Sequence, residues 1–197
     1  MAKIVQGGAS RRTCLRIMAA AAGGTAVGVG GALSVGRLGR APEGPWLVLT
    51  PEEAQLVDAV AEQIVPSDRD PGAREAGVVR FIDRQLDGPY KRFVEKYRRG
   101  LASLQQSCRA LFGKPFEALG WSEQTRVLQD LEAGKVSKEH WKDPGSKEFF
   151  NLIRDHTMQG FYGSPRHGGN KHYASYRMMG LEYPRVIGQN RYPEAAR

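Results

Sequence analysis

Apolar side chains recur at helical spacing throughout the region after residue 50, and this periodicity limits the possible folds more than any other feature of the sequence. Thr50-Pro51-Glu52-Glu53 reads as a capping box with proline at the first helical position, which predicts a helix over about 51–65. No stretch alternates polar and apolar residues with period two. We therefore predict an all-α fold, with further helices from Val78 to Gly88-Pro89, over 90–111, from a Ser122 cap to near Gly134, from Ser146 onward and briefly at 173–179.

Several side chains are expected to lie inside this fold. The third helix places on one face Tyr90, Phe93, Tyr97, Leu101, Leu104, Cys108 and Leu111. On this basis we expect Cys108 to be a buried thiol, and we expect His156, on an apolar helical face, to be a hydrogen-bonded core residue rather than a catalytic base.

Residues 1–36 have the pattern of an export signal, because a paired arginine precedes the uncharged run 17–35. The twin-arginine pattern Ser/Thr-Arg-Arg-x-Phe-Leu-Lys is matched at Ser10, Arg11, Arg12 and Leu15. Arg16 keeps the charge, and Cys14 departs from the pattern. The twin-arginine translocase carries folded proteins, so this chain either holds its own cofactor or travels with a partner that holds one.

The run 17–35 could also be read as a transmembrane helix, but its five glycines, at 23, 24, 28, 30 and 31, weaken that interpretation. Small residues near Ser34-Val35-Gly36 predict cleavage there, and an uncleaved anchor is the alternative. Beyond this signal we expect a linker over 37–49, one helical domain over 50–185 whose C-terminal part is irregular and rich in glycine and aromatic residues, and an irregular tail over 186–197.

The net charge of +8 does not indicate nucleic-acid binding. Lys3, Arg11, Arg12 and Arg16 belong to the signal, so 29 − 4 = 25 basic residues face 21 acidic ones in the rest of the chain. The densest basic group is predicted to be a solvated helix face and comprises Lys91, Arg92, Lys96, Arg98 and Arg99.

The sequence contains no motif for catalysis or for a cofactor. Cys-x-x-Cys-His, a cysteine cluster and Gly-x-Ser-x-Gly are all absent. Asp68 and Asp70 lie between prolines and are expected to form a turn, and His167 and His172 are too few for a metal site. We predict no catalytic, cofactor-binding or metal-binding residue in this chain.

Two separated motifs resemble the gluconate 2-dehydrogenase subunit 3 family. The first comprises Pro66, Asp68, residues 71–78 and Phe81-Ile82-Asp83, and the second comprises Gly160-Phe161-Tyr162-Gly163, Pro165 and Gly168-Gly169-Asn170. The resemblance implies a non-catalytic small subunit whose partner is a flavoprotein dehydrogenase large subunit. It also implies FAD in that partner, a multihaem cytochrome c subunit with haem c as electron acceptor, and export of the large subunit together with this chain. The complex would be periplasmic and associated with the cytoplasmic membrane.

The second motif departs from the family pattern at His167, where Tyr is frequent, and Tyr176 stands where Trp is usual. A glycine and aromatic loop of this kind suits either a partner interface or closure of the subunit's own core. The candidate interface residues are Phe161, Tyr162, Gly163, Pro165, His167, Gly168, Gly169, Asn170 and Tyr176. The alternatives to an escort subunit are a membrane-anchored scaffold and a free-standing periplasmic enzyme that uses Asp68, Asp70 or His167.

Overall fold

The computed structural model of the chain describes residues 44–181, 186–187 and 190–191. The predicted signal, most of the predicted linker and most of the tail lie outside these residues. The long helices are α2 (Pro51–Ile64), α3 (Val78–Asp87), α4 (Val94–Phe112), α5 (Trp121–Ala133) and α6 (Ser146–Tyr162), followed by the short α7 (Ala174–Met178). Single 3₁₀ turns are η1 (Lys91–Phe93), η2 (Phe116–Ala118), η3 (Pro165–His167) and η4 (Lys171–Tyr173). The predicted all-α class is confirmed.

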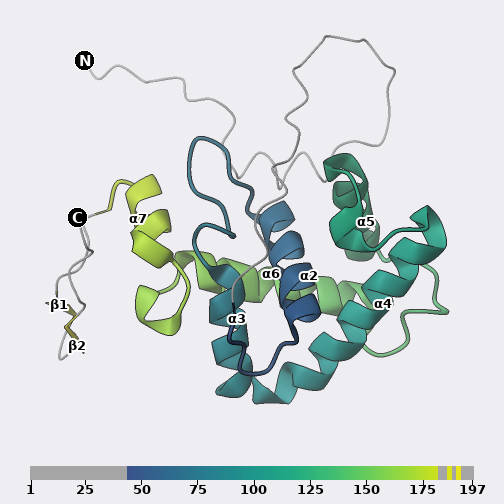
Figure 1. Cartoon of the computed structure of the whole chain (residues 1–197), viewed down its shortest axis with the longest axis horizontal. Coiled ribbons are helices and arrows are strands. Elements are labelled where there is room, and N and C mark those ends of the chain that lie inside the picture. The colour runs from purple at the N-terminus through teal and green to yellow at the C-terminus, as the bar shows by residue number, and fades with distance from the viewer. Residues whose placement is uncertain (1–43, 182–185, 188–189, 192–197) are drawn as a thin grey trace, which may run out of the picture. The chain divides into compact units, whose positions relative to one another are not determined.

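Helices α2 and α6 lie at the centre of the arrangement. Each contacts α3, α4 and α5, and the two contact each other (Figure 1). Helix α6 also contacts α7, so the C-terminal turns continue from the end of a central helix. No helix among the described residues is both long enough and apolar enough to cross a membrane.

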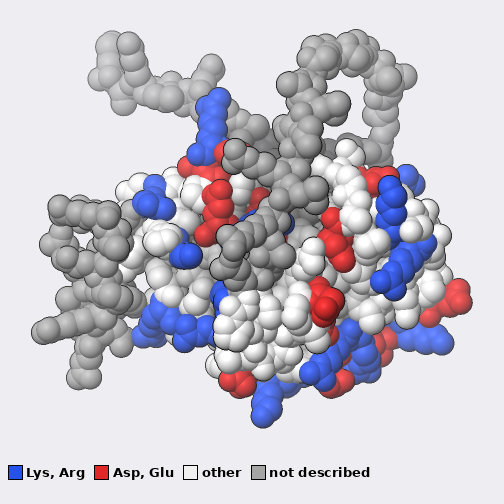
Figure 2. Space-filling model, in the orientation of Figure 1, with Lys and Arg blue, Asp and Glu red and all other residues white. Residues whose placement is uncertain are grey.

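Charges of both signs are spread over the face shown in Figure 2. Members of the basic group on η1 and α4 likewise lie close to acidic side chains. Lys96 pairs with Glu148, Arg98 Nη1 lies 3.6 Å from Glu95 Oε1, and Arg99 Nη1 lies 2.6 Å from Asp143 Oδ2. These are exposed pairs of the kind that contribute about 1 kcal/mol or less each. The predicted solvated helix face is confirmed.

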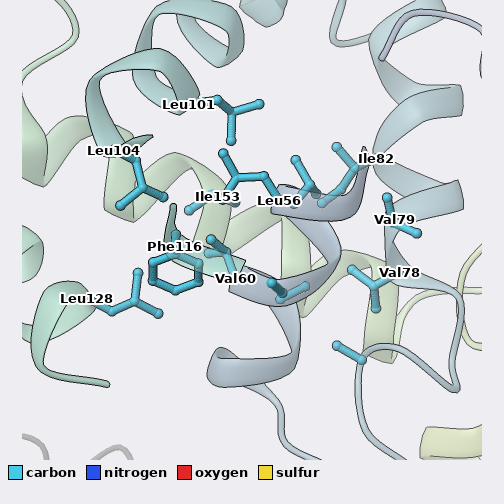
Figure 3. Packing of buried hydrophobic residues seen from close by; sticks show 14 of the residues in the cluster. Leu56, Val60, Val78, Val79, Ile82, Leu101, Leu104, Phe116, Leu128 and Ile153 are labelled. Atoms are coloured by element: carbon cyan, nitrogen blue, oxygen red, sulfur yellow. The ribbon is translucent and has the colours of Figure 1, made fainter. Parts of the chain in front are cut away.

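One apolar core joins the five long helices. Val60 of α2, Ile82 of α3 and Ile153 of α6 are among the side chains that meet in Figure 3. Leu104 of α4 and Phe116 of η2 have no exposed surface and pack into the same cluster. Burying side chains of this size contributes about 1.5–3 kcal/mol each, which makes this cluster the main source of stability.

The capping box at the start of α2 is confirmed. The amide N–H of Glu53 donates to Thr50 Oγ1 at 3.2 Å, and the Glu53 carboxylate accepts the Thr50 N–H at 2.9 Å. The start predicted for α5 is wrong by two residues. Gly120, rather than Ser122, is the N-cap, because its N–H donates to the Glu123 carboxylate at 2.8 Å.

Two further expectations are corrected. The predicted helix over 90–111 is divided into η1 and α4, and Leu111 near its end is 69% exposed rather than buried. In the tail expected to be irregular, Val186–Ile187 and Asn190–Arg191 pair as the antiparallel strands β1 and β2.

Cys108 and His156 are buried as predicted. Burial raises the pKa of the Cys108 thiol to about 12 and lowers the pKa of His156 to about 4, so both are neutral at pH 7. Tyr97 Oη lies 3.0 Å from His156 Nδ1, and the ring of Tyr90 stacks on the imidazole at 4.3 Å between centroids. His156 therefore ties α4 to α6 as a core hydrogen-bonding group.

Candidate functional site

The first motif forms a turn that is held by two buried acids of α2. The Glu62 carboxylate accepts the backbone N–H of Ser67 at 2.9 Å and of Arg74 at 3.0 Å. Asp58 Oδ2 accepts a hydrogen bond from Arg74 Nε at 2.6 Å. Burial raises the pKa of Asp58, and Arg74 opposes this rise by stabilising the carboxylate. Glu62 and Asp58 thus fix the path of the chain from α2 to α3.

Asp68 and Asp70 form a local turn, as predicted. The Asp70 N–H donates to Asp68 Oδ1 at 2.9 Å, and the Asp68 N–H donates to the Asp70 carbonyl oxygen at 3.1 Å. This is the pattern by which Asp stabilises a turn through its own neighbouring backbone.

Asn170 is the centre of the second motif. Its side chain is fully buried, its φ is +46°, and it joins two parts of the chain. Asn170 Nδ2 donates to the Gly163 carbonyl oxygen at 2.9 Å, while Oδ1 accepts the Ser175 N–H at 2.9 Å. A side-chain carbon at Gly169 would overlap the Gly160 carbonyl oxygen. The loop therefore packs against the end of α6 at a distance that only glycine permits.

The two motifs meet in space although residues 84–159 lie between them in the chain. The Lys171 N–H donates to the Ala76 carbonyl oxygen at 2.9 Å. A side chain at Gly160 would press on Phe81, with 2.9 Å between the added carbon and the ring. The motifs thus form one structural unit in which the ends of α3 and α6 are packed together.

The predicted interface residues divide into two groups. Phe161, Gly169 and Asn170 are buried, so they close the subunit's own core and do not reach the surface. The partly or fully exposed members are Tyr162, Gly163, Pro165, His167, Gly168 and Tyr176. The interface prediction therefore narrows to this second group, and to the rings of Tyr162, His167 and Tyr176 in particular.

An open groove of about 580 Å³ lies beside this surface. Helix α3 contacts both α6 and η3, and residues of these three elements form most of the walls of the groove. The lining residues are Phe81, Gln85, Tyr90, Met158, Gln159, Tyr162, Gly163 and His167. Of these, the sequence pointed to Tyr162, Gly163 and His167 as interface candidates. Nothing in the sequence associates Gln85, Tyr90, Met158 or Gln159 with a site, because these residues come from three separate segments that meet only in the folded chain.

A second feature not evident from the sequence is the attachment of residues 44–49 to α3. Asp83 is 1% exposed, and its carboxylate accepts the backbone N–H groups of Leu47, Val48 and Leu49 at 2.8, 3.0 and 3.0 Å. Arg80 Nη1 donates to the Pro45 carbonyl oxygen at 2.8 Å. This part of the predicted linker is therefore held on the folded domain.

The groove is lined by side chains that can contact a ligand or a partner. Aromatic rings, a thioether and two carboxamides line the groove, with His167 as its one titratable imidazole. Among the described residues, no three His, Cys, Asp or Glu side chains are grouped so that they could hold a metal ion.

Comparison with known proteins gave one family. The model for gluconate 2-dehydrogenase subunit 3 matches residues 51–182, a range that includes every long helix and both motifs. Searches of curated proteins and of solved structures returned no match.

Proposed function

We propose that this chain, which belongs to the gluconate 2-dehydrogenase subunit 3 family, is a non-catalytic small subunit that binds, stabilises and escorts a flavoprotein dehydrogenase. The family is one of subunits of a dehydrogenase complex, and the finer role is our proposal. The observation that carries it is the family match over 51–182 together with the second motif, whose exposed rings adjoin the open groove.

The fold supports a binding role in a specific way. Asn170 and Gly169 are buried and hold the loop rigidly, while Tyr162 and His167 from the same motif face the groove. A surface whose side chains are fixed before binding loses less conformational entropy on association. In the second motif, buried residues therefore stabilise the loop, and exposed side chains are available to contact a partner.

The remaining parts of the proposal concern cofactors and location. FAD belongs to the large subunit, and haem c belongs to a multihaem cytochrome c subunit that accepts the electrons. The twin-arginine signal around Arg11 and Arg12 directs this chain and its bound partner to the periplasm. The complex remains on the cytoplasmic membrane through its other subunits.

Co-expression with the flavoprotein dehydrogenase of the source organism tests the proposal. We expect an affinity-tagged chain to retain that subunit with stoichiometric FAD, and we expect the chain expressed alone to be colourless and inactive with gluconate and an artificial acceptor. Turnover or bound chromophore in the chain alone would instead identify a free-standing enzyme, and the absence of a complex would contradict the proposal.

A further inference from the structure

The chain segment that supplies one side of the groove between α3 and α6 carries basic but no acidic side chains. From His156 to Leu181 the chain has no Asp or Glu, whereas it has Arg166, Lys171 and Arg177. On α4, by comparison, Lys96 and Arg99 are each paired with an acid.

Two exposed arginines lie at the edge of the groove. Arg166 Nε donates to His167 Nε2 at 3.0 Å, which places the guanidinium next to a lining residue. Arg84 lies beside Gly168, because its Cδ would be 2.9 Å from a side-chain carbon added there. Neither Arg84 nor Arg166 forms an ion pair within the described part of the chain, so both can meet a carboxylate of a partner.

Two acids that are close in sequence to lining residues, Asp155 and Asp87, do not line the groove themselves. Asp155 precedes Gln159 by one helical turn, and its carboxylate is held by Arg154 Nη2 at 2.9 Å. Asp87 ends α3 and is exposed. Neither residue lines the groove, whose walls contain no acidic side chain.

The walls are suited to an apolar segment with a few polar groups. Phe81 and Met158 pack against the core and present apolar surface. The Tyr90 hydroxyl is hydrogen-bonded to Gln159 Oε1 and is therefore fixed in place. The Gln85 carboxamide has no hydrogen-bond partner within the residues that the structure describes, which leaves a donor and an acceptor for a peptide backbone.

From the apolar walls, the available carboxamide and the two arginines at the edge, we infer that this groove is the docking site for an apolar, carboxylate-bearing segment of the flavoprotein subunit. The inference rests on the proposed function and adds the surface and the chemistry of recognition. Arg84 and Arg166 bind the carboxylate, and Tyr162 supplies apolar contact area. Aromatic and arginine side chains of this kind dominate the binding energy of many protein interfaces.

The test measures the affinity between purified wild-type or variant chain and the FAD-containing dehydrogenase of the source organism. Arg84→Gln combined with Arg166→Gln is expected to raise the Kd by about tenfold or more and to reduce its dependence on salt between about 50 and 500 mM NaCl. The matched control is Arg109→Gln combined with Arg126→Gln. Like Arg84, Arg109 is an exposed arginine in the last turn of a helix, and both control residues lie away from the groove.

An aromatic pair of variants tests the apolar part. Tyr162→Ala is expected to raise the Kd by about tenfold. Trp121→Ala, which removes a half-exposed ring outside the groove, is expected to leave it unchanged. Circular dichroism of each free variant verifies that it folds. If the groove variants bind as the controls do while the wild type binds tightly, the groove assignment is wrong and the escort function stands. If the wild type does not bind, both are refuted.

Discussion

The attachment of residues 44–49 to α3 gives a stability prediction that can be worked out from the structure. Asp83 Oδ2 accepts the Leu47 N–H, and Oδ1 accepts those of Val48 and Leu49. In the Asp83→Asn variant, one side-chain oxygen can still accept the N–H groups of Val48 and Leu49, but an NH₂ group replaces the oxygen that accepts the Leu47 N–H. The change removes one hydrogen bond to a charged group, worth about 1.5–3 kcal/mol, and replaces two such bonds by weaker neutral ones.

We therefore expect Asp83→Asn to lower the free energy of unfolding by about 2–4 kcal/mol, less than the sum of three full bonds because Leu47 is 60% exposed and its hydrogen bond is only partly buried. Urea denaturation followed by far-ultraviolet circular dichroism measures it. At a slope of about 2 kcal/mol per M, the midpoint moves down by about 1–2 M. Asp87→Asn, the same substitution at an exposed position of the same helix, is the control and is expected to change stability by less than about 0.5 kcal/mol. If the midpoints of the two variants coincide, the stabilising role given to Asp83 is wrong.

Two further predictions concern the buried residues. Gly169→Val is expected to destabilise the fold by more than about 3 kcal/mol, because the valine side chain would overlap the Gly160 carbonyl oxygen. The control Gly145→Val, with open space around the added side chain, is expected to cost about 1 kcal/mol or less. Thermal denaturation compares the two variants, and equal melting temperatures would contradict the close approach of Gly169 to Gly160. His156 has a pKa of about 4 in the fold and an ordinary value of 6.5, so the unfolded chain binds the proton first as the pH falls, and stability is lost between about pH 6.5 and pH 4. The His156→Gln variant can still form a hydrogen bond with Tyr97, and its free energy of unfolding should fall by up to about 3 kcal/mol less than that of the wild type over this pH interval. Urea denaturation at several pH values measures this. If the two proteins lose stability in parallel, His156 is not a buried neutral imidazole.

Local sequence signals predicted the helices well. The Thr50–Glu53 box and the apolar spacing of α2 depend on residues within one or two turns, and the structure reproduces both. The errors occur where neighbours in space decide. Leu111 has the correct spacing for the buried face of α4 but is exposed. The α5 start was misplaced because Ser122 is a favoured cap residue, while the extended backbone of Gly120 and the Glu123 carboxylate satisfy the helix end instead.

The site was predicted only in part for the same reason. Residue type marked the Gly168-Gly169-Asn170 loop as unusual, but only the bonds of Asn170 to Gly163 and Ser175 show that it closes the core. The groove and the contact of Asp83 with residues 47–49 are assembled from segments far apart in the chain. No periodicity or local motif carries such information, so these features could be found only in the folded structure.

We propose that this chain carries a flavin-loaded dehydrogenase across the membrane, and replacement of Arg11 and Arg12 by Lys is the decisive test. The change keeps both charges and removes the guanidinium groups by which we propose the signal is recognised. Cell fractionation with antibodies to each subunit is the measurement. We predict that both proteins accumulate in the cytoplasm, the large subunit with its FAD, and that dehydrogenase activity on the periplasmic side is lost. If the large subunit still reaches the periplasm at its normal level while this chain is retained, the escort function is contradicted.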